Sequence, residues 1–124
     1  MIDLQRLRKS FGYAFAGISY SFKENQNIKI HIISGILVLF FGLILGLTKY
    51  EMFSVGLLIV LVISAEMINT SIEEVVDLLV NEHRLEAKIA KDVGAGMVLL
   101  VSIFAFIAGV FIFAPHIILL FQPY

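Results

Sequence analysis

An apolar run leads directly into a row of acidic side chains in residues 52–77, which read MFSVGLLIVLVISAEMINTSIEEVVD. Its apolar part, 52–72, carries a single charged residue, Glu66. A helix needs about 20 mostly apolar residues to cross the hydrocarbon core of a bilayer. The run therefore predicts a transmembrane helix over 52–72 that continues into an acidic segment.

Two further apolar segments flank this one. Residues 30–47 carry no formal charge after His31, and no residue from 93 to 124 is formally charged. We expect spans over 30–47 and 93–115, with Pro115 marking where the third span frays or bends, because proline lacks a backbone donor. The turn between the first two spans, 48–51, is so short that these helices must be antiparallel neighbours.

The composition of the whole chain agrees with a membrane protein. Of 124 residues, 60% are hydrophobic and 15% are charged, and the mean hydropathy is +0.97. A soluble domain is about 45–50% apolar and about 25% charged, so a soluble globular enzyme is excluded. The net charge of −1 gives no basic field for nucleic acid. The chain has no cysteine, which excludes disulfides and thiolate metal sites.

The basic residues predict an orientation. Five of the nine precede the first span, three lie within 73–92, and only Lys49 is on the other side. The excess of Lys and Arg on cytoplasmic loops places the N-terminus and 73–92 in the cytoplasm and the C-terminus outside. Residues 1–29 lack a continuous apolar core, so we expect no cleavable signal peptide.

The segment before the first span has the pattern of an amphipathic helix over about 3–22. Apolar residues recur at spacings of three and four on one face, and they are Leu4, Leu7, Phe11, Phe15, Ile18 and Phe22. The opposite face is basic and polar, which suits the membrane interface. Packing of the same face against other protein is an equal alternative. No repeat or long linker appears, so we expect one domain, 1–124.

Four polar side chains share one face of the second predicted helix. At about 100° per residue, Glu66, Asn69, Glu73 and Asp77 fall within an arc of about 80°. Carboxylates near lipid are costly to ionise, so a divalent cation, basic partners or protonation must offset the cost. Hard oxygen ligands favour Mg²⁺. The alternative is a polar helix end that reaches into water, which fits poorly for Glu66 at membrane depth.

A second polar cluster lies where the chain re-enters the membrane. It holds Lys88, Lys91 and Asp92 and is followed by the small residues 94–96, which permit close helix packing. Basic residues near lipid headgroups are common, but beside acidic metal ligands they suit a nucleoside triphosphate. The rival interpretation is a non-catalytic assembly whose acidic row lines a cation path, which Lys91 would hinder. The three histidines, 31, 83 and 116, are expected in packing or at interfaces.

Several stretches of the chain resemble one known family. Residues 66–78, EMINTSIEEVVDL, are followed by 87–92, AKIAKD, and a glycine–alanine turn. This pattern is similar to that of the small bacterial integral-membrane diacylglycerol kinases, a family that includes undecaprenol kinases. The resemblance extends to 11–17, FGYAFAG, and to 27–31, NIKIH.

The resemblance implies a fold and an activity. The fold is a homotrimer of all-α protomers, each with three transmembrane helices and a surface helix, and with active sites shared between protomers. The activity is that of a kinase in the bacterial cytoplasmic membrane, which uses ATP and Mg²⁺ to phosphorylate a lipid alcohol. The form of 69–78, NTSIEEVVDL, is closer to the undecaprenol branch, so we expect undecaprenol as the acceptor, with diacylglycerol as the alternative.

The resemblance also implies residue roles. Glu66 matches the catalytic base and Glu73 a Mg²⁺ ligand. The cofactor contacts that it implies are Arg6, Tyr13, Asn69, Glu73, Glu82, Lys91 and Asp92. One position departs from the family, because Asn25 stands where a second metal-binding Glu is usual and Glu24 precedes it. Since one residue turns a helix by about 100°, either residue is open as the ligand, and we favour Glu24.

Overall fold

Helices are the only regular secondary structure in the part of the chain that the structure describes. The structure is a computed structural model, and it describes residues 3–80, 82 and 84–122. The helices are α1 (Leu4–Glu24), α2 (Gln26–Ile44), α3 (Lys49–Leu79) and α4 (Leu85–Leu120). The predicted all-α class is confirmed for these residues.

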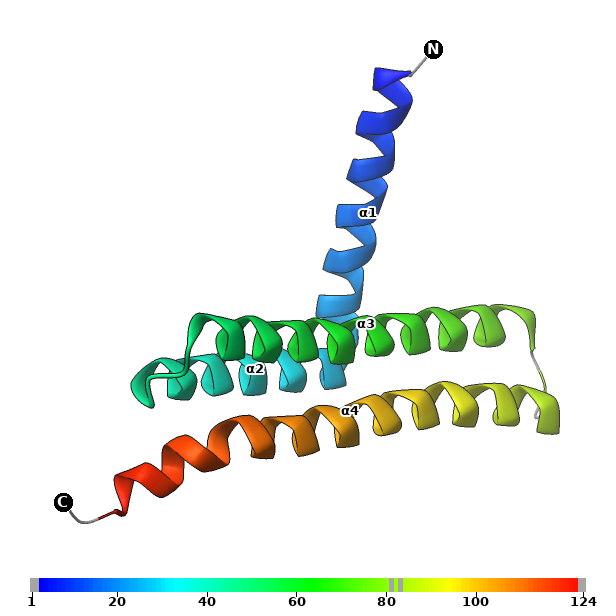
Figure 1. The fold of residues 1–124 in the computed structure, drawn as a ribbon. Coiled ribbons are helices and arrows are strands. Elements are labelled where there is room, and N and C mark those ends of the chain that lie inside the picture. The colour runs from blue at the N-terminus through cyan, green and yellow to red at the C-terminus, as the bar shows by residue number, and fades with distance from the viewer. Residues whose placement is uncertain (1–2, 81, 83, 123–124) are drawn as a thin grey trace.

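Three of the helices have the length and composition of membrane spans. They are α2, α3 and α4, and each contains most of one predicted span. Both α2 and α4 pack against α3, and the chain reverses direction at each connection (Figure 1). Few apolar side chains are buried, namely Ile28, Val55, Val62, Ala65 and Val98. The remaining apolar surface faces outward, as lipid or neighbouring chains require.

The first helix is set apart from these three. It begins with Asp3, whose side chain accepts hydrogen bonds from the backbone N–H groups of Gln5 and Arg6. It rises steeply from the other helices and meets α2 at Asn25 (Figure 1). The predicted helix over 3–22 is therefore present, and its place at the membrane surface stays a prediction.

The turn between α2 and α3 lies earlier than expected. We predicted it at 48–51, but Lys49 already begins α3. The reason is a capping box, in which Thr48 Oγ1 accepts from the Glu51 backbone at 3.3 Å and Glu51 Oε2 accepts from the Thr48 backbone at 2.7 Å. Gly46 makes the turn with a φ of 73°, which glycine adopts at low cost.

The helix does not end at Pro115, because α4 continues to Leu120; a bend of the third span at Pro115 stays a prediction. A proline inside a helix removes one backbone hydrogen bond, and contacts with neighbouring helices can offset that loss in a membrane protein. The residue after Pro115 makes a contact with another helix, because His116 Nε2 lies 3.1 Å from Glu51 Oε1 at the start of α3.

Candidate functional site

The predicted polar row is present on α3, and it is graded in burial. Glu66 and Asn69 are 2% and 5% exposed, Glu73 is half-buried, and Asp77 is exposed. The first three line one pocket of 430 Å³ together with His31 of α2 and Ala95 and Ser102 of α4. The structure thus brings three members of the row into one cavity between the three long helices.

Glu66 is held from the junction of α1 and α2. Asn25 Nδ2 donates to Glu66 Oε2 at 3.3 Å, and His31 Nε2 lies 3.6 Å from Glu66 Oε1. The Thr70 hydroxyl accepts a 2.7 Å hydrogen bond from Asn25 Nδ2 and donates to the Glu66 backbone oxygen at 2.9 Å. A buried carboxylate needs such polar partners, because burial without them is costly.

Asn69 connects α3 to α4. Its Nδ2 donates to Glu73 Oε1 at 3.0 Å. Its Oδ1 is buried and has no hydrogen-bond partner among the described residues. A Cβ atom on Gly94 would lie 2.4 Å from that oxygen, whereas one on Gly96 would meet nothing within 4 Å. The close helix approach predicted for 94–96 therefore occurs at Gly94.

The two residues proposed as alternative metal ligands line the same pocket but differ in how their oxygens are engaged. Glu24 lines a polar pocket of 220 Å³ with Glu73 and Glu74. The Oδ1 of Asn25 accepts from the Asn27 and Ile28 backbones and so caps α2. The carbonyl oxygen that a metal would need is thus occupied at Asn25.

The carboxylates fit Mg²⁺ only as part of a nucleotide complex. Within the described residues, no group of three His, Cys, Asp or Glu side chains could hold a metal ion. Mg²⁺ typically keeps waters and binds one or two carboxylates together with substrate phosphates. The shared pocket of Glu24 and Glu73 matches that smaller requirement.

A second pocket collects three of the seven predicted nucleotide contacts. It measures 370 Å³, and its charged lining residues are Asp77, Glu82, Arg84, Lys88, Lys91 and Asp92. Lys91 forms an ion pair with Asp77 across α3 and α4. The structure therefore brings Glu82, Lys91 and Asp92 together, with the Lys91 ammonium group engaged by a carboxylate.

Two predicted nucleotide contacts are not brought to either pocket within one chain. Arg6 and Tyr13 lie in the N-terminal part of α1, which extends away from the other helices (Figure 1), and Tyr13 is 74% exposed. The C-terminal end of α1 is the part fastened to α3, where the Tyr20 hydroxyl donates to Glu74 at 2.7 Å. That hydrogen bond also raises the pKa of Tyr20.

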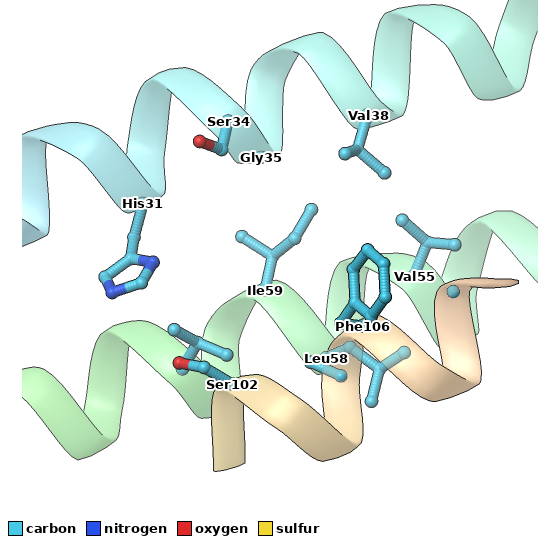
Figure 2. Close-up of a pocket in the computed structure, with 12 residues that line it drawn as sticks. His31, Ser34, Gly35, Val38, Val55, Leu58, Ile59, Ser102 and Phe106 are labelled. Atoms are coloured by element: carbon cyan, nitrogen blue, oxygen red, sulfur yellow. The ribbon is translucent and has the colours of Figure 1, made fainter. Parts of the chain in front are cut away.

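An apolar groove continues from the 430 Å³ pocket of Glu66, Asn69 and Glu73, which we call the acidic pocket. Figure 2 shows its first section, a 290 Å³ pocket between α2, α3 and α4. His31 and Ser102 line both this section and the acidic pocket. A further 500 Å³ section shares Val38, Phe106 and Gly109 with the first and reaches Ile117 of α4. One groove thus runs from the buried carboxylate along most of the third span.

Sequence reasoning missed the residues that surround Glu66. An Asn between two helical segments is an N-cap signal, and that signal could have marked Asn25 as a junction, but nothing in the sequence places its amide beside Glu66. His31 and His116 both pair with carboxylates, which fits the predicted packing role. His83 lies outside the described residues.

Three helices that are long and apolar enough to span a membrane, with the buried carboxylate of Glu66 in a pocket between them, define a membrane protein with a polar site among its spans. A sequence profile described as "Prokaryotic diacylglycerol kinase" matches residues 12–113. The chain belongs to this prokaryotic diacylglycerol kinase family, as the resemblance indicated.

Two relatives support this membership. A diacylglycerol kinase of Synechocystis sp. is 42% identical over 111 residues, which cover 88% of this chain and 63% of that protein. The undecaprenol kinase of Bacillus subtilis is 36% identical over 115 residues, which cover 93% of this chain and 94% of that protein. The chain thus spans less than two thirds of the Synechocystis relative. The names of the family and of both relatives indicate a lipid kinase.

Proposed function

We propose that this chain transfers the γ-phosphate of ATP to the hydroxyl group of a membrane lipid alcohol, with Glu66 as the base. The observation that carries the proposal is the position of Glu66, a buried carboxylate in the acidic pocket, next to the apolar groove. A lipid alcohol has the matching shape, with one hydroxyl at the end of an apolar tail.

The reaction assigns a task to each part of the site. The Glu66 carboxylate takes the hydroxyl proton while the lipid oxygen bonds to the γ-phosphorus. The bond from that phosphorus to the bridging oxygen breaks, and ADP leaves with the electron pair. Phosphoryl transfer depends mainly on alignment and on neutralising charge. Asn69 and Glu73, joined by a hydrogen bond, lie one and two turns along α3 and would face the phosphates.

The nucleotide would extend along the ends of α3 and α4. The pocket of Glu82, Lys91 and Asp92 begins where the acidic row continues to Asp77. Lys91 would exchange its Asp77 partner for a phosphate oxygen. Mg²⁺ held by Glu73 and Glu24 would supply the charge neutralisation that phosphoryl transfer requires.

The apolar groove offers a place for the lipid tail. From Ser102 to Ile117 it follows α4 for about 22 Å at about 1.5 Å per residue, and its lining is almost wholly apolar. A tail in this groove would hold the hydroxyl at the level of His31 and Ser102, next to Glu66. Acceptor and product would remain in the leaflet while the nucleotide enters from the cytoplasm.

We infer that the acceptor is undecaprenol, with diacylglycerol as the second candidate. The undecaprenol kinase of Bacillus subtilis matches over nearly its full length. The diacylglycerol kinase of Synechocystis has the higher identity but extends well beyond this chain. Both lipids present a primary hydroxyl on apolar tails, so only an assay separates them.

We further infer that the active unit is a homotrimer in the bacterial cytoplasmic membrane, with the N-terminus in the cytoplasm and the C-terminus outside. A helix transverse to three spans would lie along the membrane surface, which suits the amphipathic pattern of α1. Arg6 and Tyr13 would then reach the site of a neighbouring protomer.

The proposal is tested with purified protein and radiolabelled ATP in mixed micelles that contain undecaprenol, diacylglycerol or ceramide. Labelled undecaprenyl phosphate is the expected product, and labelled phosphatidic acid would establish the second candidate. Absence of any labelled lipid from a folded, nucleotide-binding sample would overturn the proposal.

Glu66→Gln is the matched control for the chemistry. Base catalysis contributes typically about 10²–10⁴-fold, so we expect at least a hundredfold loss of turnover with nucleotide binding retained. A variant that keeps more than about a tenth of the activity would contradict the assignment of Glu66 as the base.

A further inference from the structure

Asn25 occupies the point where α1, α2 and α3 meet, and both ends of its amide are used. Its Oδ1 accepts from the backbones of Asn27 and Ile28 at the start of α2. Its Nδ2 donates to Glu66 Oε2 at 3.3 Å and to Thr70 Oγ1 at 2.7 Å. The orientation of the amide follows from this pattern, because two backbone donors face one end, which must be the oxygen.

We propose that Asn25 is a positioning residue for the carboxylate of Glu66, an inference that rests on the proposed base role of Glu66. The amide joins that carboxylate to the N-terminus of α2, so the junction of α1 and α2 fixes the direction in which the base points. Thr70 completes the arrangement, because it receives the second Nδ2 hydrogen and is itself bonded to the Glu66 backbone. Glu66 thereby keeps one orientation within a pocket that it shares with Asn69 and Glu73.

The neutral amide serves this task better than a carboxylate in its place. Asn is a donor at Nδ2 and an acceptor at Oδ1, so it can cap a helix and bond a carboxyl oxygen at once. An Asp at position 25 would still cap α2, since Asn and Asp are equally good N-caps. It would, however, place a second carboxylate about as close to Glu66 as Nδ2 lies now, and adjacent like charges repel.

Asn25→Asp therefore separates positioning from capping. We expect kcat to fall about 10- to 100-fold, because a displacement of about 1 Å at a reacting group can cost about a hundredfold. The KM for ATP and the Mg²⁺ midpoint should stay close to wild type. Thr70→Val is the second variant, since it removes the acceptor that orients Nδ2 without touching the cap, and we expect a several-fold loss of kcat.

The double variant Asn25→Asp/Glu66→Gln shows whether the effect passes through Glu66. If Asn25 acts by positioning that carboxylate, the double variant has the residual activity of Glu66→Gln alone. A role in folding or capping would instead multiply the two losses.

The outcomes separate this inference from the proposed function. If Glu66→Gln retains activity, the base assignment fails, whatever Asn25→Asp does. If Glu66→Gln is inactive while Asn25→Asp keeps the wild-type kcat, the positioning role alone is overturned. If Asn25→Asp lowers the Mg²⁺ midpoint at unchanged or higher kcat, position 25 binds the metal, and the positioning role is overturned as well.

Discussion

A single methyl group added to Gly94 should disable the site from the side of α4. The Cβ of an alanine there would lie 2.4 Å from Asn69 Oδ1, which is 1.0 Å short of the 3.4 Å at which ordinary contact begins. Either Asn69 must rotate or α4 must withdraw by about that distance. Rotation breaks the 3.0 Å bond from Asn69 Nδ2 to Glu73 Oε1. Because a shift of about 1 Å can reduce turnover about a hundredfold, we expect a loss of that order for Gly94→Ala.

The stability of the same variant follows from two opposing terms. Overpacking typically costs about 1–3 kcal/mol, and replacing glycine by alanine inside a helix returns about 1 kcal/mol. The net cost is therefore about 0–2 kcal/mol, which leaves the protein folded. Gly96→Ala is the matched control, since its Cβ would meet nothing within 4 Å. It should keep full activity and gain up to about 1 kcal/mol.

The assay for both variants is lipid phosphorylation with radiolabelled ATP in mixed micelles, together with thermal unfolding in the same detergent. Gly94→Ala/Asn69→Ala removes the clash, so it should regain thermal stability without regaining activity. If Gly94→Ala keeps more than half of the wild-type turnover, or if Gly96→Ala loses as much, the close contact between α4 and Asn69 is not what the site depends on.

Three further predictions address the charged groups. Glu73→Gln should raise the Mg²⁺ concentration for half-maximal activity while leaving the KM for the lipid unchanged, and an unmoved midpoint would show that Glu73 is not a ligand. Lys91→Ala should raise the KM for ATP about tenfold or more. Asp77→Asn should change the free energy of unfolding by less than about 1 kcal/mol, as expected for an exposed ion pair. If both variants change the KM for ATP equally, Lys91 acts only through its ion pair with Asp77. Mixed trimers of Glu66→Gln and Arg6→Ala protomers should recover part of the activity, and absence of recovery with cross-linked mixed trimers would place each site within one protomer.

The fold was predictable where one physical term dominates. Three apolar segments of bilayer length cannot be buried in a chain of this size, so each must be a span. The ends of the helices were less predictable than the spans themselves. Thr48 and Glu51 form a capping box that starts α3 within the predicted turn, and α4 continues through Pro115 to Leu120. The start of α3 depends on side-chain hydrogen bonds, which hydropathy does not register.

The candidate site was predictable along one helix and not across helices. Helical periodicity alone places Glu66, Asn69 and Glu73 on a common face, and the pocket that they line agrees. The partners of Glu66 lie 41 residues away at Asn25 and on α2 at His31. Such contacts depend on how α1 turns into α2, and a single sequence gives no measure of that angle.

The direction of α1 bears on how Arg6 and Tyr13 could form their predicted nucleotide contacts. Its C-terminal end is held at Asn25 and by the bond from Tyr20 to Glu74, and the rest of the helix extends away from the other helices (Figure 1). Of its residues, only Ser21 is buried within the chain. An amphipathic arm with both faces exposed must place its apolar side on lipid or on another copy of the chain, because exposed apolar stripes are otherwise unfavourable. If α1 lies along the membrane surface, it passes over whatever stands beside the three spans. In a trimer that neighbour carries the same acidic pocket, so the arrangement that covers the apolar face would also bring Arg6 and Tyr13 to a nucleotide.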